Sequence, residues 1–100
     1  MSDGDDRQSA RSVQIRIEGN VQGVGFRNWM QRMAGQLALT GWVRNRRDGS
    51  VEAVLSGPAA AVEDALGRCR MGPRSAKITA VTVIGENAPV AEGFEIQPGH

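Results

Sequence analysis

The sequence has few of the residues that form disulfides or transition-metal sites. Its 100 residues include one cysteine, Cys69, and one histidine, His100, which is the last residue. A single cysteine cannot form an internal disulfide and suits a reducing compartment, so we expect a cytoplasmic protein. One Cys and one terminal His are too few ligands for a zinc-type site, so we expect no metal site.

Long apolar runs and targeting segments are also missing. No apolar stretch approaches the length of about 20 residues that a membrane-spanning helix needs, so we expect no membrane association. Residues 1–12 (MSDGDDRQSARS) lack the apolar core of a signal peptide and are rich in Ser, Asp and Gly. We therefore expect residues 1–12 to be a flexible tail and residues 13–100 to form one domain with a single hydrophobic core.

Acidic residues are scarce in the first half of this domain. Between residues 13 and 47 the only acid is Glu18, and the arginines are Arg16, Arg27, Arg32, Arg44, Arg46 and Arg47. Arginine suits forked contacts with phosphate or carboxylate groups. Most of these side chains fit a solvated surface, but an anionic small-molecule substrate or weak nucleic-acid binding would fit the remainder.

Hydrophobic periodicity predicts a strand followed by a helix. Residues 13–18 (VQIRIE) alternate between apolar and polar, which is typical of a half-buried strand. Apolar residues then recur at steps of three and four, which predicts an amphipathic helix. Its core face would be Phe26, Trp29, Met30, Met33 and Leu37. We expect Thr40-Gly41 to end this helix, with Gly41 in the left-handed conformation.

A hairpin and a second helix are predicted next. Asp48-Gly49 lies between the strand-like residues 41–47 and 50–56, which predicts a β-hairpin with both turn residues at positive φ. Gly57-Pro58 predicts the start of the helix. Its core face would be Val62, Ala65, Leu66 and Cys69, so Cys69 is interpreted as a core residue rather than a nucleophile.

Two further strands complete the pattern. Gly72-Pro73 would end the second helix, residues 76–84 (AKITAVTVI) are rich in β-branched residues, and residues 94–97 would form a short final strand at an edge. The order β-α-β-β-α-β predicts an α+β, ferredoxin-like split βαβ sandwich. Its antiparallel sheet would carry both helices on one face.

The glycine-rich segment GNVQGVGFR, residues 19–27, connects the first strand to the first helix. The first amides of a helix lack intrahelical acceptors, and a curled loop before it can cradle an anion. Gly23 and Gly25 would permit the necessary dihedrals. A tight turn without a ligand would explain the glycines equally well, but Arg27 in the first helical turn opposes the helix dipole unless an anion lies there.

Asn45 interrupts the strand that follows the helix, where asparagine is a poor strand former. Alternation places it on the same face as Gly41 and Val43. Either it points to solvent from an edge strand, or its amide holds a water beside the anion. If that strand lies near the glycine-rich loop, one pocket would combine N–H donors, a guanidinium and a water-orienting amide.

Two segments, GNVQGVGFR at residues 19–27 and GWVRNRRDGSVE at residues 41–52, together closely resemble the acylphosphatase family. The resemblance extends over residues 13–97. It implies a ferredoxin-like enzyme that hydrolyses acyl phosphates to carboxylate and inorganic phosphate without metal or cofactor. Arg27 matches the phosphate-binding arginine and Asn45 the asparagine that positions the attacking water. The phosphate cradle matches Val21, Gln22, Gly23, Val24, Gly25 and Phe26.

The sequence departs from the family pattern at two positions. Asn20 stands where a basic or hydroxyl residue is common, and Ala38 where the end of the helix often has glycine. We expect a monomer that acts on a small-molecule acyl phosphate, with no nucleic-acid partner. The alternative is a non-catalytic ferredoxin-like module that binds phosphate or nucleic acid.

Overall fold

A computed structural model describes residues 9–99 of the chain. The predicted flexible tail lies largely outside the described residues. Its last part does not, because the first strand begins at Ala10 rather than at Val13. Within residues 9–99, no helix has the length and apolar character needed to cross a membrane.

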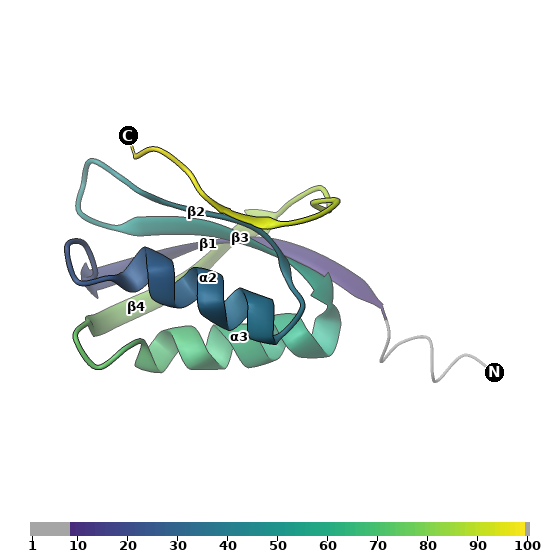
Figure 1. Cartoon of the computed structure of the whole chain (residues 1–100), viewed down its shortest axis with the longest axis horizontal. Coiled ribbons are helices and arrows are strands. Elements are labelled where there is room, and N and C mark those ends of the chain that lie inside the picture. Colours follow the sequence, from purple (N-terminus) through teal and green to yellow (C-terminus); the bar gives the residue numbers. More distant parts are fainter. Residues whose placement is uncertain (1–8, 100) are drawn as a thin grey trace.

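The described residues form one sheet with two helices on one of its faces (Figure 1). The elements are β1 (Ala10–Asn20), α2 (Phe26–Gln36), β2 (Thr40–Asn45), β3 (Val51–Pro58), α3 (Ala59–Met71), β4 (Lys77–Glu86) and β5 (Phe94–Ile96). The strand order is β4-β1-β3-β2-β5. The first four strands pair antiparallel, as predicted, whereas β5 runs parallel to β2 and makes the sheet mixed. The ferredoxin-like fold is confirmed.

The core lies between the sheet and the helices. Alternate residues of the two central strands, Val13, Ile15, Ile17, Val51, Ala53 and Leu55, face the helices and are fully buried. The buried side of α3 consists of the four residues that its periodicity predicts. One of them is Cys69, where burial raises the pKa of the thiol to about 12. Cys69 is therefore a core residue, and its thiol stays protonated near neutral pH.

The open face of the sheet is held together by a buried carboxylate. Glu52 on β3 is 3% exposed and accepts hydrogen bonds from Arg44, Arg46 and Gln14. Burial alone would raise the pKa of Glu52, but these hydrogen bonds and the nearby charge of Arg44 outweigh it, and the pKa is lowered. The carboxylate thus stays ionised near neutral pH and holds Arg44 and Arg46, two of the six arginines between residues 13 and 47.

The first helix ends differently from the prediction. Its left-handed residue is Ala38, with φ 57°, and Gly41 lies inside β2. Leu39 N–H bonds to Ala34 C=O and Ala38 N–H to Gly35 C=O, the pattern of a Schellman motif. Gly41 is required for another reason: a Cβ there would lie 1.8 Å from the carbonyl oxygen of Val54 on β3.

The β2–β3 hairpin is present, but its turn is not the predicted one. Only Gly49 has a positive φ, 94°, and Asp48 does not. Gly49 N–H bonds to Arg46 C=O and Arg46 N–H bonds to Ser50 C=O, which closes a three-residue loop with glycine at its left-handed position. Asp48 accepts hydrogen bonds from the hydroxyl and the backbone N–H of Ser50, and these lower its pKa.

The strained position of Ala38 gives a stability prediction. Ala38→Gly should raise the free energy of unfolding by about 0.5–1 kcal/mol, because glycine adopts the left-handed conformation without a Cβ clash. Ala38 is exposed, so little packing is lost. Urea titration of both proteins measures the difference. The matched control, Ala60→Gly in the exposed first turn of α3, should be destabilising. A loss of stability at both positions would contradict the assignment of strain to Ala38.

A second prediction concerns Glu52. Glu52→Gln should lower the free energy of unfolding at pH 7 by about 2 kcal/mol, the scale of hydrogen bonds to a charged group. The folded-state pKa of Glu52 is below its ordinary value of 4.5. Its contribution is therefore complete above that value and is lost as the pH falls through the folded-state pKa. The difference between the two proteins, followed by denaturant titration, should shrink below pH 4.5.

The matched control for this experiment is Glu63→Gln. Glu63 pairs with Arg11, but its side chain is 66% exposed, so the change should have little effect on stability at any pH. Equal effects at the two positions, or a Glu52→Gln difference that does not change with pH, would refute the role of Glu52.

Candidate active site

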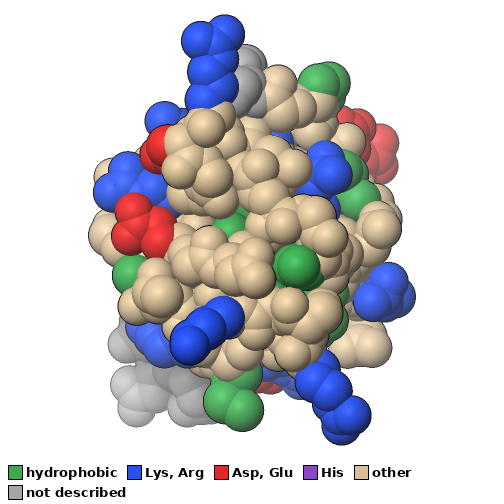
Figure 2. Space-filling view, turned by 90° about the vertical axis from the view of Figure 1, so that its left-hand side faces the viewer, with side chains coloured by type: hydrophobic (Ala, Val, Ile, Leu, Met, Phe, Trp, Pro, Cys, Tyr) green, Lys and Arg blue, Asp and Glu red, His purple; other side chains and the backbone are tan. Residues whose placement is uncertain are grey.

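Three segments that are distant in the sequence meet at one end of the sheet. They are the loop between β1 and α2, the β2–β3 hairpin and the chain that follows β5 (Figure 1). Figure 2 looks onto this end: backbone and uncharged side chains occupy most of its middle, and charged side chains, more of them Lys and Arg than Asp and Glu, lie mainly toward its edge. The glycine-rich segment and Asn45 both belong to this end of the fold.

The start of α2 is left open. Gly25 is the N-cap residue, with φ 81°, and Gly23 has φ 74°, so both glycines adopt the left-handed conformation that the sequence analysis anticipates. No side chain caps the helix, its first turn contains no acidic residue, and the first helical hydrogen bond is Trp29 N–H to Gly25 C=O. The preceding amides therefore have no intrahelical acceptor.

The loop is fixed from the side opposite to these amides. The hydroxyl of Ser75 donates a hydrogen bond of 2.7 Å to the carbonyl oxygen of Val24. In a trans peptide unit the C=O and N–H point in opposite directions, so Gly25 N–H points away from Ser75. Val21 and Phe26, each 1% exposed, anchor the two ends of the loop in the core. The loop is thus held by its carbonyl side and its apolar residues.

A cavity of about 240 Å³ lies against this loop. Its lining residues are Val21, Gly23, Gly25, Phe26, Arg27, Asn28 and Ile96. Since a water molecule takes about 30 Å³ in the liquid, the cavity has room for a small anion together with water. Of the predicted cradle, only Gln22 and Val24 are missing from the lining. The side chain of Gln22 instead donates hydrogen bonds to the carbonyl oxygens of Arg46 and Ser50.

Arg27 is the cationic side chain of this cavity. It lies in the first turn of α2 and is half-buried. Within residues 9–99 it forms no ion pair, whereas Arg44 and Arg46 are both held by Glu52. A positive group at a helix N-terminus is unfavourable without a counter-anion. The electrostatics of the cavity therefore favour an anionic ligand.

Asn45 lies at the same end of the sheet, at the end of β2, but it is not among the residues that line the cavity. Its side-chain Oδ1 is buried and has no hydrogen-bond partner among the described residues. The alternative of an edge-strand asparagine that points to solvent is therefore wrong, because this oxygen is buried and β2 has β5 as a further neighbour in the sheet. An unpaired buried amide oxygen costs free energy, so it has the properties of a site for a bound donor such as water.

The C-terminal segment adds a wall that the sequence analysis missed. Ile96 lines the cavity and pairs with Val43, which lies two residues before Asn45. Gly99 packs on Asn45: a Cβ there would lie 3.2 Å from the carbonyl oxygen of Asn45. Neither residue carries a sequence signal for this role, because it depends on the parallel pairing of β5 with β2.

Comparisons with known proteins identify the family of this chain. The family model described as Acylphosphatase matches residues 13–96, most of the chain. The chain belongs to the acylphosphatase family. Among curated proteins, the acylphosphatase of Nitrobacter hamburgensis is 57% identical over 88 residues, which cover 86% of this chain and 85% of the relative. The resemblance stated from the two sequence motifs is thereby confirmed.

Solved structures lead to the same family. The crystal structure of acylphosphatase from Bacillus subtilis is similar with a TM-score of 0.80 and 34% identity, covering 89% of this chain and 99% of that one. Full-length HypF, solved in a phosphate- and nucleotide-bound form, is similar with a TM-score of 0.82 and 26% identity. There the match covers 92% of this chain but only 12% of that one, so the acylphosphatase fold also occurs within a much longer chain.

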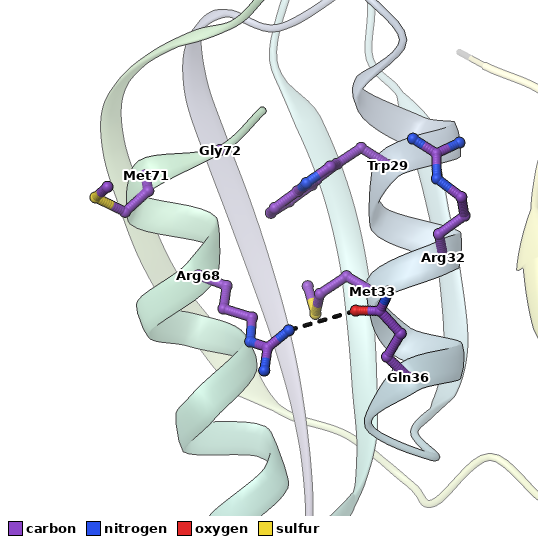
Figure 3. Close-up of a pocket in the computed structure, with 7 residues that line it drawn as sticks. All are labelled: Trp29, Arg32, Met33, Gln36, Arg68, Met71 and Gly72. Carbon is purple, nitrogen blue, oxygen red and sulfur yellow. Dashed lines mark hydrogen bonds between the residues drawn. The ribbon is translucent and has the colours of Figure 1, made fainter. Parts of the chain in front are cut away.

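This acylphosphatase fold has a second cavity, of about 260 Å³, between α2 and α3 (Figure 3). Its lining residues are Trp29, Arg32, Met33, Gln36, Arg68, Met71 and Gly72. Figure 3 shows the indole of Trp29 directed toward α3 and Arg32 directed away from it, while Arg68 bonds to Gln36. None of these residues belongs to the two motifs, and none of them carries a buried polar side-chain atom left without a partner among the described residues.

Metal ligands are not grouped in the part of the chain that the structure describes. Within residues 9–99 there is no set of three or more His, Cys, Asp or Glu side chains that could hold a metal ion. Of the two departures from the family pattern, Asn20 is exposed at the end of β1 and Ala38 forms the helix end described above.

Proposed function

We propose that this chain hydrolyses acyl phosphates in the cavity at the start of α2. The class of reaction follows from membership of the acylphosphatase family. The proposed residue roles are binding of the phosphoryl group by the amides of residues 21–27 and the guanidinium of Arg27, and orientation of the attacking water by Asn45. The observation that carries this proposal is the uncapped N-terminus of α2, which lies at the cavity together with Arg27, an arginine without an ion pair among the described residues.

The reaction needs little acid–base chemistry. An acyl phosphate is a mixed anhydride whose leaving group is a carboxylate. Water forms a bond to phosphorus, the bond from phosphorus to the acyl oxygen breaks, and the electron pair leaves with the carboxylate. The proton of the water passes to a phosphoryl oxygen of the substrate. The protein's tasks are alignment of the water opposite the leaving group and stabilisation of charge on the phosphoryl oxygens.

Backbone amides and Arg27 are suited to stabilise charge on the phosphoryl oxygens. They are fixed before the substrate arrives, so they stabilise developing charge without reorganisation. Arg27 presents a fork that matches two phosphoryl oxygens, and the helix start adds partial positive charge. Asn45 is suited to align the attacking water. Its buried Oδ1 would accept a hydrogen bond from the water, which leaves a lone pair of the water oxygen free for attack.

The proposal also covers the oligomeric state, the compartment and the ligands of the protein. We infer a monomer that acts in the cytoplasm on a small-molecule acyl phosphate, with no metal, cofactor or nucleic acid. A buried, unpaired Cys69 is compatible with a reducing compartment. Assays on acetyl, benzoyl and carbamoyl phosphate, with phosphate monoesters as negative controls and a chelator present, would measure the substrate class directly.

The rival function is binding of single-stranded RNA, which ferredoxin-like domains recognise by stacking bases on exposed aromatic side chains of the central strands. On β1 the apolar residues Val13, Ile15 and Ile17 face the helices and are buried, so they cannot contact a base. The open face instead presents residues such as Gln14 and Glu52 on the central strands, without an aromatic residue. Trp42 lies on the neighbouring β2, stacked against Arg44 at 4.9 Å. This arrangement does not favour binding of single-stranded RNA.

Arg27→Ala should lower kcat by about a hundredfold or more, because a charge-stabilising donor of the transition state is removed. It should also weaken binding of inorganic phosphate. Arg27→Lys should recover little, since a point charge lacks the fork. Steady-state kinetics on acetyl phosphate, with phosphate as competitive inhibitor, measure both effects. Arg32→Ala on the same helix is the matched control and should stay near wild type; near-wild-type turnover of Arg27→Ala would refute the role.

Asn45→Ala should lower kcat by a similar factor while leaving the inhibition constant of phosphate nearly unchanged, because it removes an interaction with the water and not with the phosphoryl group. Asn87→Ala, at an exposed position outside the site, is the control. The same inhibition assay applies. Should phosphate affinity fall as far as kcat, Asn45 would be a phosphate ligand instead, and the assignment to water would be wrong.

A further inference from the structure

We propose that Gln22 is a positioning residue that holds the β2–β3 hairpin, and with it Asn45, in place against the phosphate cradle. This inference rests on the proposed function, because it assigns a residue that acts through Asn45. Gln22 belongs to the cradle segment, yet its side chain does not line the cavity. It reaches across to a segment more than twenty residues away in the sequence.

The contacts of Gln22 define this role. Its Nε2 donates hydrogen bonds of 2.7 Å to Arg46 C=O and 2.9 Å to Ser50 C=O. Because both partners are carbonyl oxygens, which only accept, the orientation of the side-chain amide is unambiguous. A single amide group therefore uses both of its N–H donors on the same hairpin.

The carbonyl groups of Arg46 and Ser50 belong to the two residues that flank the three-residue hairpin loop. Arg46 N–H already bonds to Ser50 C=O, and Gly49 N–H bonds to Arg46 C=O. Gln22 adds a second hydrogen bond to each of these oxygens and so connects the base of the hairpin loop to the loop between β1 and α2. Arg46 directly follows Asn45, so the backbone on the C-terminal side of Asn45 is fixed relative to the loop that would hold the phosphoryl group.

The cradle itself has other supports. Val24 is tied to Ser75, and Val21 and Phe26 are anchored in the core. Loss of the Gln22 side chain should therefore leave the cradle largely formed and release the hairpin. A water displaced by a fraction of an ångström from the line of attack lowers turnover more than it lowers phosphate affinity.

Gln22→Met, which keeps the length of the side chain but removes both donors, should lower kcat on acetyl phosphate by about tenfold or more. The inhibition constant of inorganic phosphate should change by less than about threefold, since the phosphate ligands remain. The matched control is Gln31→Met. Gln31 also donates from Nε2 to a backbone carbonyl, that of Phe94, at 2.8 Å, and its loss should leave kcat near wild type.

A double-mutant cycle separates positioning from general damage. In an Asn45→Ala background, Gln22→Met should cost much less in kcat than in the wild type, because the water is no longer oriented. An equal cost in both backgrounds would overturn the inference while leaving the proposed function intact. If Asn45→Ala itself kept full turnover, the proposed function would fail first. A loss of phosphate affinity equal to the loss of kcat would make Gln22 a phosphate ligand rather than a positioning residue.

A second variant tests the inference if Gln22→Met is unstable. In Gln22→Glu, an ionised carboxylate would face two carbonyl oxygens and could donate to neither. Once protonated, it can donate to one of them. The ratio of its kcat to that of the wild type should therefore rise as the pH is lowered from 7 toward 5. A ratio that stays flat over this range would contradict the role of the hydrogen bonds.

Discussion

The backbone amides at the start of α2 have no acceptor within the helix, and the neighbouring structure leaves them open. Gly25 supplies the turn without a capping side chain, and no acid occupies the first turn. In most helices a Ser, Thr, Asp or Asn would satisfy one of these amides at the N-cap. Here the open amides and Arg27 together give the start of α2 a positive potential that favours an anion. The loop before the helix is correspondingly held by its carbonyl and apolar groups.

The distribution of arginine partners makes this site selective. Arg44 and Arg46 are next to Asn45 in the sequence, but strand alternation directs Arg44 to the open face of the sheet, and both arginines are held there by the buried carboxylate of Glu52. Arg27 on the helix side has no such partner among the described residues. The sheet therefore separates Arg44 and Arg46, which Glu52 holds, from Arg27 at the cavity, and a count of charges along the sequence could not have distinguished them.

Much of the fold could be predicted because it depends on local periodicity. The alternation of residues 13–18 predicts which face of β1 is buried, and the helical spacing predicts the buried side of α3. Predictions failed where a distant contact overrides a local rule. The local pattern predicts that Gly41 ends the helix, but it is needed where β2 approaches Val54, and Ala38 is the residue in the left-handed position. The partners of Gln22 and the packing of Gly99 on Asn45 depend on tertiary contacts that no local pattern encodes.

The composition of the cavity limits the chemistry that it can perform. Among the residues that the structure describes, those lining the cavity include no Asp, Glu, His, Cys, Lys or Tyr, so none of these side chains is suited to accept a proton at neutral pH. A substrate with a poor leaving group, such as an alcohol, would need a proton donor that the cavity does not offer. A carboxylate leaves without protonation, and a phosphoryl oxygen can take the proton of the water. The described lining therefore suits hydrolysis of an anhydride, which is the reaction of the acylphosphatase family, better than hydrolysis of an ester.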